Sequence, residues 1–368
     1  MHMRPTYALA LAASGPLWTR LEASIPKAAF PVAEEWASHG AALASSLTNT
    51  PINETATLDP ALATRVYHLY LPIYFFARER VRAHKAAGFT GAVTIGLSAP
   101  QGCGKTTLVD ALLELFEADG LVPAAVSFDD FYLEGKQQDA LAAEHSTNPL
   151  LQVRGNAGTH DMELGTETLR ALTRREAAAI PRYDKAARSG RGDRAPKATW
   201  PRLKKPADIV LFEGWMNGFA PLPSDSAVLS QHAGLNGVNE RLGDYEAKWH
   251  GKMDAWVVLG LEDVSSVYGW RLQAERAMAA QGRPGMSDAQ VADFVSRYMP
   301  AYDAYLPGLY EAAEGEGVGG KPTLLVWVDK KRAPVVGRTR CINWKCQMSK
   351  MLGRASLPAL RWGMVLGS

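Results

Sequence analysis

The sequence contains little cysteine. Three cysteines among 368 residues are too few for a disulfide scaffold, so we expect the chain to work in a reducing compartment. Cys103 lies in a glycine-rich stretch, whereas Cys341 and Cys346 lie close together near the end of the chain. None belongs to a C-x-x-C pair or to a cluster with histidine, which excludes the usual zinc sites.

Long apolar runs and a strong overall charge are also lacking. No run of about 18 apolar residues occurs, so we expect no membrane span. The net charge of +2 hides a basic tail, because residues 330–368 carry nine Lys or Arg and no acidic residue. Residues 1–329 hold 31 basic and 38 acidic side chains, a net charge of −7, which argues against a nucleic-acid surface.

The first 20 residues lack acidic side chains, and their apolar run at 7–13 is short. A secretory signal would have a longer apolar core, and a transit peptide would be richer in Ser and Arg. We interpret this stretch as an ordinary helical start, with the remnant of a targeting segment as the alternative.

The composition of the rest is that of a globular protein long enough for one large domain or two small ones. Residues 1–90 read as a helical layer, in which Asp59-Pro60 starts a helix and Pro72 should kink it. Beyond them, apolar runs alternate with helical patterns over 91–330, which predicts an α/β fold with a five-stranded, mainly parallel sheet wrapped by helices. The expected strands are 93–97, 124–128, 209–212, 255–261 and 324–328.

The stretch SAPQGCGKTT at residues 98–107 nearly matches the phosphate-binding pattern G-x-x-x-x-G-K-[ST], with Ala99 in place of the first glycine. A buried strand precedes it and a helical pattern follows it, which is the context that such a loop needs. Gly102 and Gly104 let the backbone amides approach phosphate, Lys105 reaches the β- and γ-phosphates, and Thr106 offers its hydroxyl to Mg²⁺. We therefore expect a phosphate-loop kinase fold.

The remaining motifs favour a small-molecule kinase. The GTPase motif N-K-x-D and the D-E pair of mechanical ATPases are absent, and the strand at 209–212 ends in a single acid, Glu213. The acids Asp129 and Asp130 follow another strand, where ligands of open α/β sheets bind. We expect Asp129 to act as the base toward an attacking hydroxyl, and Asp130 to serve Mg²⁺-bound water or structure.

Cationic side chains supply the other expected groups. The segment 131–207 should form an acceptor lid, and its arginines suit an anionic acceptor, although a solvated surface loop would carry the same residues. Arg271, at the start of an amphipathic helix, should stabilise transferred phosphate charge, and Arg276 is a weaker candidate.

Taken together, the motifs resemble the plant-type D-glycerate 3-kinases, in the uridine-kinase-like group of phosphate-loop kinases. The resemblance spans residues from about 13 to about 329. Its most specific parts are RGNAGTHD and SGRGDR between D-D-F-Y and F-E-G-W. The resembling segments are SAPQGCGKTTL, SFDDFYL, RGNAGTHD, PRYDKAARSGRGDR, LFEGWMNGF, WRLQAE and PGMSDAQVADFVSRYMPAYDAYLP.

The resemblance implies transfer of the γ-phosphate of ATP to D-glycerate with Mg²⁺, giving 3-phosphoglycerate, in photorespiration in the chloroplast. It supports catalytic roles for Asp129, Lys105 and Arg271, and metal contacts from Thr106 and Glu213. The residues expected to bind ATP are Ala99, Pro100, Gln101, Gly102, Cys103, Gly104, Lys105, Thr106 and Thr107. Those expected to bind the acceptor are Arg154, His160, Arg182, Tyr183, Arg188, Arg191 and Arg194.

Two departures from the family and two alternative functions remain. Residues 331–368 extend beyond the family's usual end, and we expect this tail to be disordered or a gene-model artefact. No chloroplast address is visible, so a cytoplasmic location is the alternative. The same fold could serve another acceptor, such as a nucleoside or pantothenate, or a nucleotide-binding regulator without turnover. The sequence specifies no oligomeric state and is compatible with a monomer.

Overall fold

The structure is a computed structural model, and it describes residues 3–52, 57–282, 285–335 and 340–342. Within these ranges, six strands form one sheet in the order β2-β5-β1-β6-β7-β8. The strands are β1 (Val93–Ser98), β2 (Pro123–Ser127), β5 (Ile209–Gly214), β6 (Ala255–Leu261), β7 (Thr323–Val328) and β8 (Arg340–Ile342). A separate two-stranded ribbon joins β3 (Tyr183–Asp184) to β4 (Asp193–Arg194).

The predicted five-stranded parallel sheet is confirmed. β1 pairs in parallel with both β5 and β6, β5 with β2, and β6 with β7. Every residue of β1, β6 and β7 is buried, as expected for parallel strands covered on both faces. The short antiparallel strand β8 on the outer side of β7 was not predicted. Of the basic tail, residues 336–339 and 343–368 lie outside the described residues.

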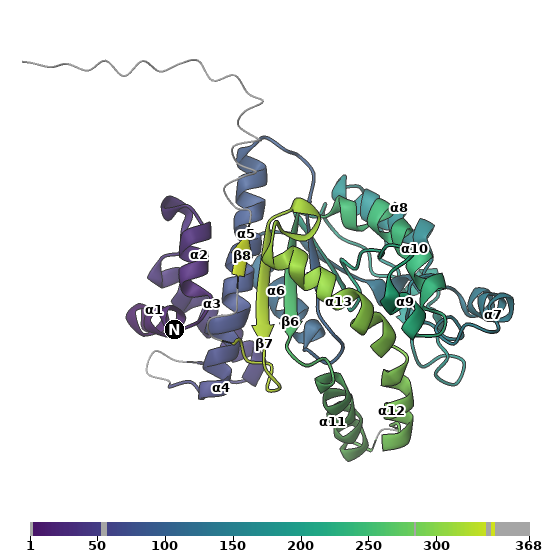
Figure 1. Cartoon of the computed structure of the whole chain (residues 1–368). Helices are drawn as coiled ribbons and strands as arrows, with labels where there is room; N and C mark the ends of the chain where they lie inside the picture. Colours follow the sequence, from purple (N-terminus) through teal and green to yellow (C-terminus); the bar gives the residue numbers. More distant parts are fainter. Residues whose placement is uncertain (1–2, 53–56, 283–284, 336–339, 343–368) are drawn as a thin grey trace, which may run out of the picture.

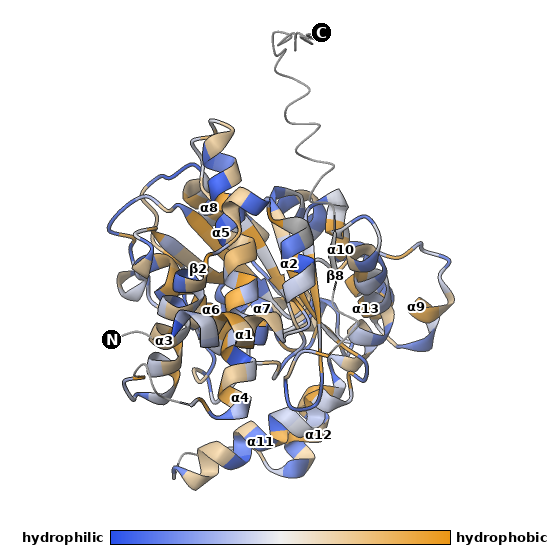
Figure 2. Cartoon of the chain, turned by 90° about the vertical axis from the view of Figure 1, so that its left-hand side faces the viewer, coloured by the Kyte–Doolittle hydropathy of each residue, from blue (hydrophilic) through white to orange (hydrophobic). Residues whose placement is uncertain are grey.

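Helices cover both faces of the sheet (Figure 1). On one side lie α1 (Pro5–Ala13), α2 (Trp18–Ser24), α3 (Ala33–Thr48), α4 (Pro60–Ala63), α5 (Leu71–Ala86) and α6 (Lys105–Ala118). On the other lie α8 (Met162–Thr173), α10 (Leu235–Lys248) and α13 (Met299–Glu314), with α7 (Gly135–Glu144) and α9 (Ala227–Gln231) farther out. Figure 2 shows the hydrophobic residues concentrated on the strands between these layers.

Pro72 is accommodated without ending the helical run. The predicted helix start at Asp59 is confirmed, because its carboxylate accepts hydrogen bonds from the amides of Ala61 and Leu62. A π-helical segment, Thr64–Tyr70, then leads into α5, and Pro72 stands in the first turn of α5. The wider π-helical turn relieves the clash between a proline ring and the preceding turn. None of the helices in the described ranges has the length and hydropathy that crossing a bilayer requires.

Two helices, α11 (Ser266–Ala280) and α12 (Asp288–Ser296), pack together and project from the body in both views (Figures 1 and 2). They lie at the edge where the parallel strands end, which is the edge that binds ligands in open α/β sheets. The shorter helical turns are η1 (Lys27–Ala29), η3 (Phe128–Phe131), η4 (Lys197–Thr199), η5 (His250–Lys252) and η6 (Val318–Gly320). The fold thus places a strand edge, a loop and a helical pair around one space.

Candidate active site

The glycine-rich loop connects β1 to α6 and adopts the backbone that its glycines allow. Gly102 and Gly104 have φ of +81° and +91°, the region that favours glycine. Gly102 also packs so closely on α11 that a Cβ atom there would lie 2.7 Å from Cβ of Trp270. Ala99 is fully buried and is not among the residues with positive φ, so the first position of the pattern does not require glycine here.

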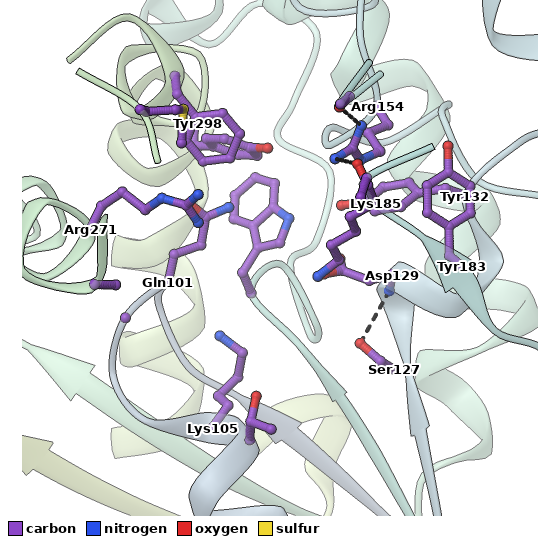
Figure 3. Close-up of a pocket in the computed structure, with 18 of the residues that line it drawn as sticks. Gln101, Lys105, Ser127, Asp129, Tyr132, Arg154, Tyr183, Lys185, Arg271 and Tyr298 are labelled. Atoms are coloured by element: carbon purple, nitrogen blue, oxygen red, sulfur yellow. Dashed lines mark hydrogen bonds and ion pairs between the residues drawn. The ribbon is translucent and has the colours of Figure 1, made fainter. Parts of the chain in front are cut away.

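The side chains of the loop divide between the cleft and the core. Gln101, Gly102, Gly104, Lys105, Thr106 and Thr107 line the cleft. Lys105 Nζ donates to the carbonyls of Ala99 (2.8 Å) and Pro100 (3.2 Å), which holds the ammonium at the mouth of the loop (Figure 3). Cys103 is buried, and burial raises its pKa to about 12, so it remains an uncharged thiol at neutral pH.

Asp129 faces this loop across the cleft. It follows β2 in the turn η3, which starts at Phe128, a residue that we expected in the strand. The hydroxyl of Ser127 accepts a hydrogen bond from the amide of Asp129 (3.2 Å), and the Asp129 carboxylate forms an ion pair with Lys185 (Figure 3). Burial acts to raise the pKa of Asp129, but Lys185 and the Tyr132 hydroxyl outweigh it and hold this pKa below its usual value.

Two further acids lie beside Asp129. Burial raises the pKa of Asp130 to about 6, although Arg182 lies 3.1 Å away and the amide of Ser127 donates to the same carboxylate (3.0 Å). Burial also raises the pKa of Glu213 at the end of β5, with Lys105 opposing and Asp129 reinforcing the shift. Three carboxylates crowd one strand edge, so a cation is favoured between them and the loop.

These acids and the Thr106 hydroxyl are oxygen donors of the kind that Mg²⁺ prefers. Thr106 and Glu213, the residues predicted to contact a metal, both line the cleft. Over the described ranges, no group of three or more His, Cys, Asp or Glu side chains is arranged to hold a metal.

Of the seven predicted acceptor residues, Arg154, Tyr183, Arg188 and Arg191 line the cleft, whereas Arg182, Arg194 and His160 do not. Arg154 donates to the carbonyls of Gly190 (2.9 Å) and Arg191 and stacks over Tyr183. Arg188 and Arg191 both pair with Asp139 of α7. These contacts fasten residues 183–191 to Arg154 and to α7, which lie earlier in the same insert.

The other three predicted residues support the wall of the cleft. Arg194 pairs with Asp161 (3.0 Å) and donates to the carbonyl of Tyr132 (3.1 Å). His160 is 4% exposed, stacks on the Tyr132 ring and shares a hydrogen bond with the hydroxyl of Tyr245 (2.7 Å). Burial lowers its pKa to about 3, so the ring is neutral.

Arg271 reaches the cleft from α11, as predicted (Figure 3). Its guanidinium pairs with Glu275 on the next turn and lies over the ring of Phe294, 4.9 Å from the centroid. Glu275 is 3% exposed and also accepts a hydrogen bond from the amide of Met286 (2.8 Å), which joins α11 to the segment before α12. Arg276, by contrast, pairs with the exposed Asp288 away from the cleft.

Sequence reasoning missed several cleft residues. Lys185 lies two positions after Tyr183 in the same basic segment, so its place in P-R-Y-D-K was a usable signal. Arg332 donates from Nε to the carbonyl of Gly102 (2.7 Å) and stacks over Trp270, yet it lies in the tail that we had set apart. Arg297 and Tyr298, after α12, also line the cleft.

The cleft enclosed by these elements has a volume of about 1310 Å³, room for a nucleotide and a small second ligand. A phosphate loop, a lysine at its mouth, a facing carboxylate and an arginine on a projecting helix are the parts of a phosphoryl-transfer site. Fold and site together define a phosphate-loop kinase.

Comparison with known proteins agrees with this class. The phosphoribulokinase/uridine kinase family model matches residues 94–221. The chain is 43% identical over 333 residues to the chloroplastic D-glycerate 3-kinase of Arabidopsis thaliana, covering 88% of this chain and 71% of that protein. It is 40% identical over 257 residues to an uncharacterized kinase of Schizosaccharomyces pombe, covering 66% of this chain and 90% of the other.

A solved structure is similar as well. The D-glycerate 3-kinase of Cryptococcus neoformans superposes with a TM-score of 0.65 at 31% identity, over 74% of this chain and 99% of that one. The chain belongs to the D-glycerate 3-kinase family.

Proposed function

We propose that this kinase transfers the γ-phosphoryl group of ATP to the 3-hydroxyl of D-glycerate, giving 3-phospho-D-glycerate and ADP. The observation that carries the proposal is the placement of Asp129 between the phosphate loop and a cationic insert in a single cleft. Two proteins similar to this chain that are named D-glycerate 3-kinases support the choice of acceptor.

At the nucleotide end, the amides of the loop and the start of α6 bind the phosphates, and Lys105 leaves its carbonyl partners for their oxygens. Arg271 adds positive charge where negative charge develops in the transition state. Thr106 and Glu213 would hold Mg²⁺, directly or through water. When bound, this ion neutralises charge on the β- and γ-phosphates.

At the acceptor end, Asp129 orients the 3-hydroxyl and takes its proton as that oxygen forms a bond to the γ-phosphorus. The bond from the γ-phosphorus to the bridging oxygen breaks, and ADP leaves with that oxygen. We assign acceptor binding to the insert at 131–207, with Arg154, Tyr183, Arg188 and Arg191 as its cleft-lining residues. Arg182, Arg194 and His160 hold the insert and the wall in place.

A substrate panel tests the proposal. Purified protein with ATP and magnesium is offered D-glycerate, uridine or pantothenate, ADP release is measured with a coupled assay, and the product is identified by ³¹P NMR. We expect release with D-glycerate and a 3-phosphoglycerate signal, which chelation of magnesium abolishes. Faster turnover of uridine or pantothenate would identify a different acceptor, and ATP binding without turnover of any acceptor would identify a regulator.

We also propose a chloroplast location and a part in photorespiration, supported by the similarity to the chloroplastic Arabidopsis enzyme. Immunogold labelling of the source cells tests the location, and label confined to the cytoplasm would reject it. The sequence specifies no oligomeric state and is compatible with a monomer, and light scattering after size-exclusion chromatography determines that state.

A further inference from the structure

The cations of the insert that face the cleft are already paired, and one pair is unlike the others. Arg154 donates to backbone carbonyls, and Arg188 and Arg191 share Asp139. Lys185 instead pairs with Asp129 (Figure 3). Within the described part of the insert, Lys185 is thus the cleft-lining cation that pairs with Asp129. Asp129 is the carboxylate that we assign to the acceptor hydroxyl.

This pair conflicts with the chemistry of the proposed reaction. A carboxylate that accepts a proton from an attacking hydroxyl must offer that hydroxyl a free oxygen. The Lys185 ammonium competes for this position, and its charge is the main opposing influence that lowers the pKa of Asp129 and weakens it as a base. The ion pair therefore occupies one carboxylate oxygen, Oδ2, and weakens the base, so its separation favours phosphoryl transfer.

We propose that Lys185 binds the carboxylate of the acceptor, and that its transfer from Asp129 to that carboxylate frees Asp129 for the acceptor hydroxyl. This inference rests on the proposed function. The incoming anion replaces Asp129 as the partner of the ammonium, so no unpaired cation is left behind. No covalent bond changes in this step, because only ionic and hydrogen-bond partners are exchanged.

The geometry permits the exchange. The Lys185 side chain is 58% exposed and ends a flexible stem, whereas its backbone carbonyl accepts a hydrogen bond from Arg154 (3.4 Å). The base of the residue is thus fastened while its amine can move. In D-glycerate a single carbinol carbon separates the carboxylate from the carbon that bears the 3-hydroxyl. A lysine that reaches Asp129 can therefore bind the carboxylate of a molecule whose hydroxyl rests on Asp129.

The exchange couples acceptor binding to base release. Without an acceptor, Asp129 stays paired and does not activate water against ATP. With glycerate bound, Asp129 is free of Lys185, and the acceptor hydroxyl takes the position beside Asp129 that the lysine held. An uncharged acceptor of the same size, such as glycerol, cannot draw Lys185 away.

The test compares Lys185→Gln with wild type on two acceptors, D-glycerate and glycerol. We expect kcat/KM for D-glycerate to fall about 10- to 100-fold, the range for loss of one charge-assisted hydrogen bond, mainly through a higher KM. The value for glycerol should not fall and should rise, because Lys185 no longer occupies Asp129, so the preference for glycerate collapses. Lys185→Arg keeps the cation and should retain the preference, and Lys197→Gln, an exposed lysine of the same insert beside Trp200, is the matched control.

A pH profile supplies a readout that a merely structural role would not move. In Lys185→Gln the opposing charge is gone and burial raises the pKa of Asp129, so the acid limb of kcat/KM for D-glycerate should move to higher pH. The acid limb should vanish in the double variant Lys185→Gln with Asp129→Asn. That loss assigns the limb to Asp129 and not to the other groups that interact with Asp129. These groups are Asp130, Tyr132, His160, Glu213 and Tyr298.

The outcomes separate this inference from the proposed function. Wild-type activity on D-glycerate with an unchanged kcat/KM in Lys185→Gln overturns the role of Lys185 and leaves the function standing. An equal loss on glycerate and glycerol also overturns it, because the loss would not depend on the carboxylate. If the wild-type protein does not turn over D-glycerate, both the proposed function and the role of Lys185 are overturned. Equal binding of fluorescent ATP by all variants shows that the variants are folded.

Discussion

The contact between Gly102 and Trp270 makes the phosphate loop sensitive to a single methyl group. In Gly102→Ala the new Cβ would lie 2.7 Å from Cβ of Trp270, whereas an ordinary contact begins at 3.4 Å. A Cβ atom cannot rotate away, because its position is fixed by the backbone that carries it. The loop and α11 must therefore separate by about 0.7 Å.

Two effects add up in this variant. Alanine at a φ of +81° costs about 1–2 kcal/mol in stability, because the left-handed region is strained for residues with a Cβ. The separation of loop and helix then displaces the amides that bind phosphate and tilts the helix that carries Arg271. Since a misplacement of about 1 Å can reduce turnover roughly 10²-fold, we expect kcat/KM for ATP to fall between tenfold and a hundredfold.

Gly120→Ala is the matched control. Gly120 has a φ of +73°, but nothing lies within 4 Å of its added Cβ, and it follows the far end of α6. It should lose a similar 1–2 kcal/mol of unfolding free energy and keep normal kinetics. The assays are ATP titration calorimetry, the coupled ADP assay at saturating D-glycerate and urea unfolding.

The comparison can refute the reasoning directly. If Gly102→Ala binds ATP and turns over as Gly120→Ala does, the contact with Trp270 does not constrain the loop. If both variants lose activity equally, left-handed strain rather than the contact is responsible.

Three further predictions concern single side chains. Asp129→Asn should keep ATP affinity and lose about 10²–10⁴-fold in kcat, the usual contribution of a positioned acid–base group, and a retained rate in the ADP assay would move the base elsewhere. Glu275→Gln should release Arg271 from its ion pair and lower kcat about tenfold with ATP affinity little changed, whereas Arg276→Gln on the same helix should match wild type. Burial lowers the pKa of His160 from 6.5 to about 3, so its neutral form contributes stability that is fully present above pH 6.5 and is lost at about 1.4 kcal/mol per pH unit as the pH falls toward 3. In His160→Asn, urea unfolding should therefore weaken less between pH 6.5 and 4 than in wild type, and parallel slopes would contradict this account.

Much of the nucleotide end of the site could be predicted because it is local. The loop from Ser98 to Thr107 is continuous in the chain, and its glycines, lysine and hydroxyls take their places from one strand, one turn and one helix. The five parallel strands were predictable for a similar reason. Each is a short apolar run that has to be buried on both faces.

The acceptor end could be predicted only in outline. The basic segment was visible, but not which of its members face the cleft. Arg194 turns inward to Asp161 and the Tyr132 carbonyl, while Lys185 turns toward Asp129 and Tyr183 lines the cleft. Those directions depend on the β3–β4 ribbon and on partners such as Asp139, which the sequence does not place.

The sequence by itself determined the five parallel strands, the phosphate loop and the acid that follows β2, because each is encoded by residues next to one another. The tertiary structure alone decided that Lys185 meets Asp129, 56 residues earlier, and that Arg332 meets the Gly102 carbonyl across 230 residues. Contacts of that kind form only when the sheet brings distant chain segments to a common edge, and no local preference of the chain records them.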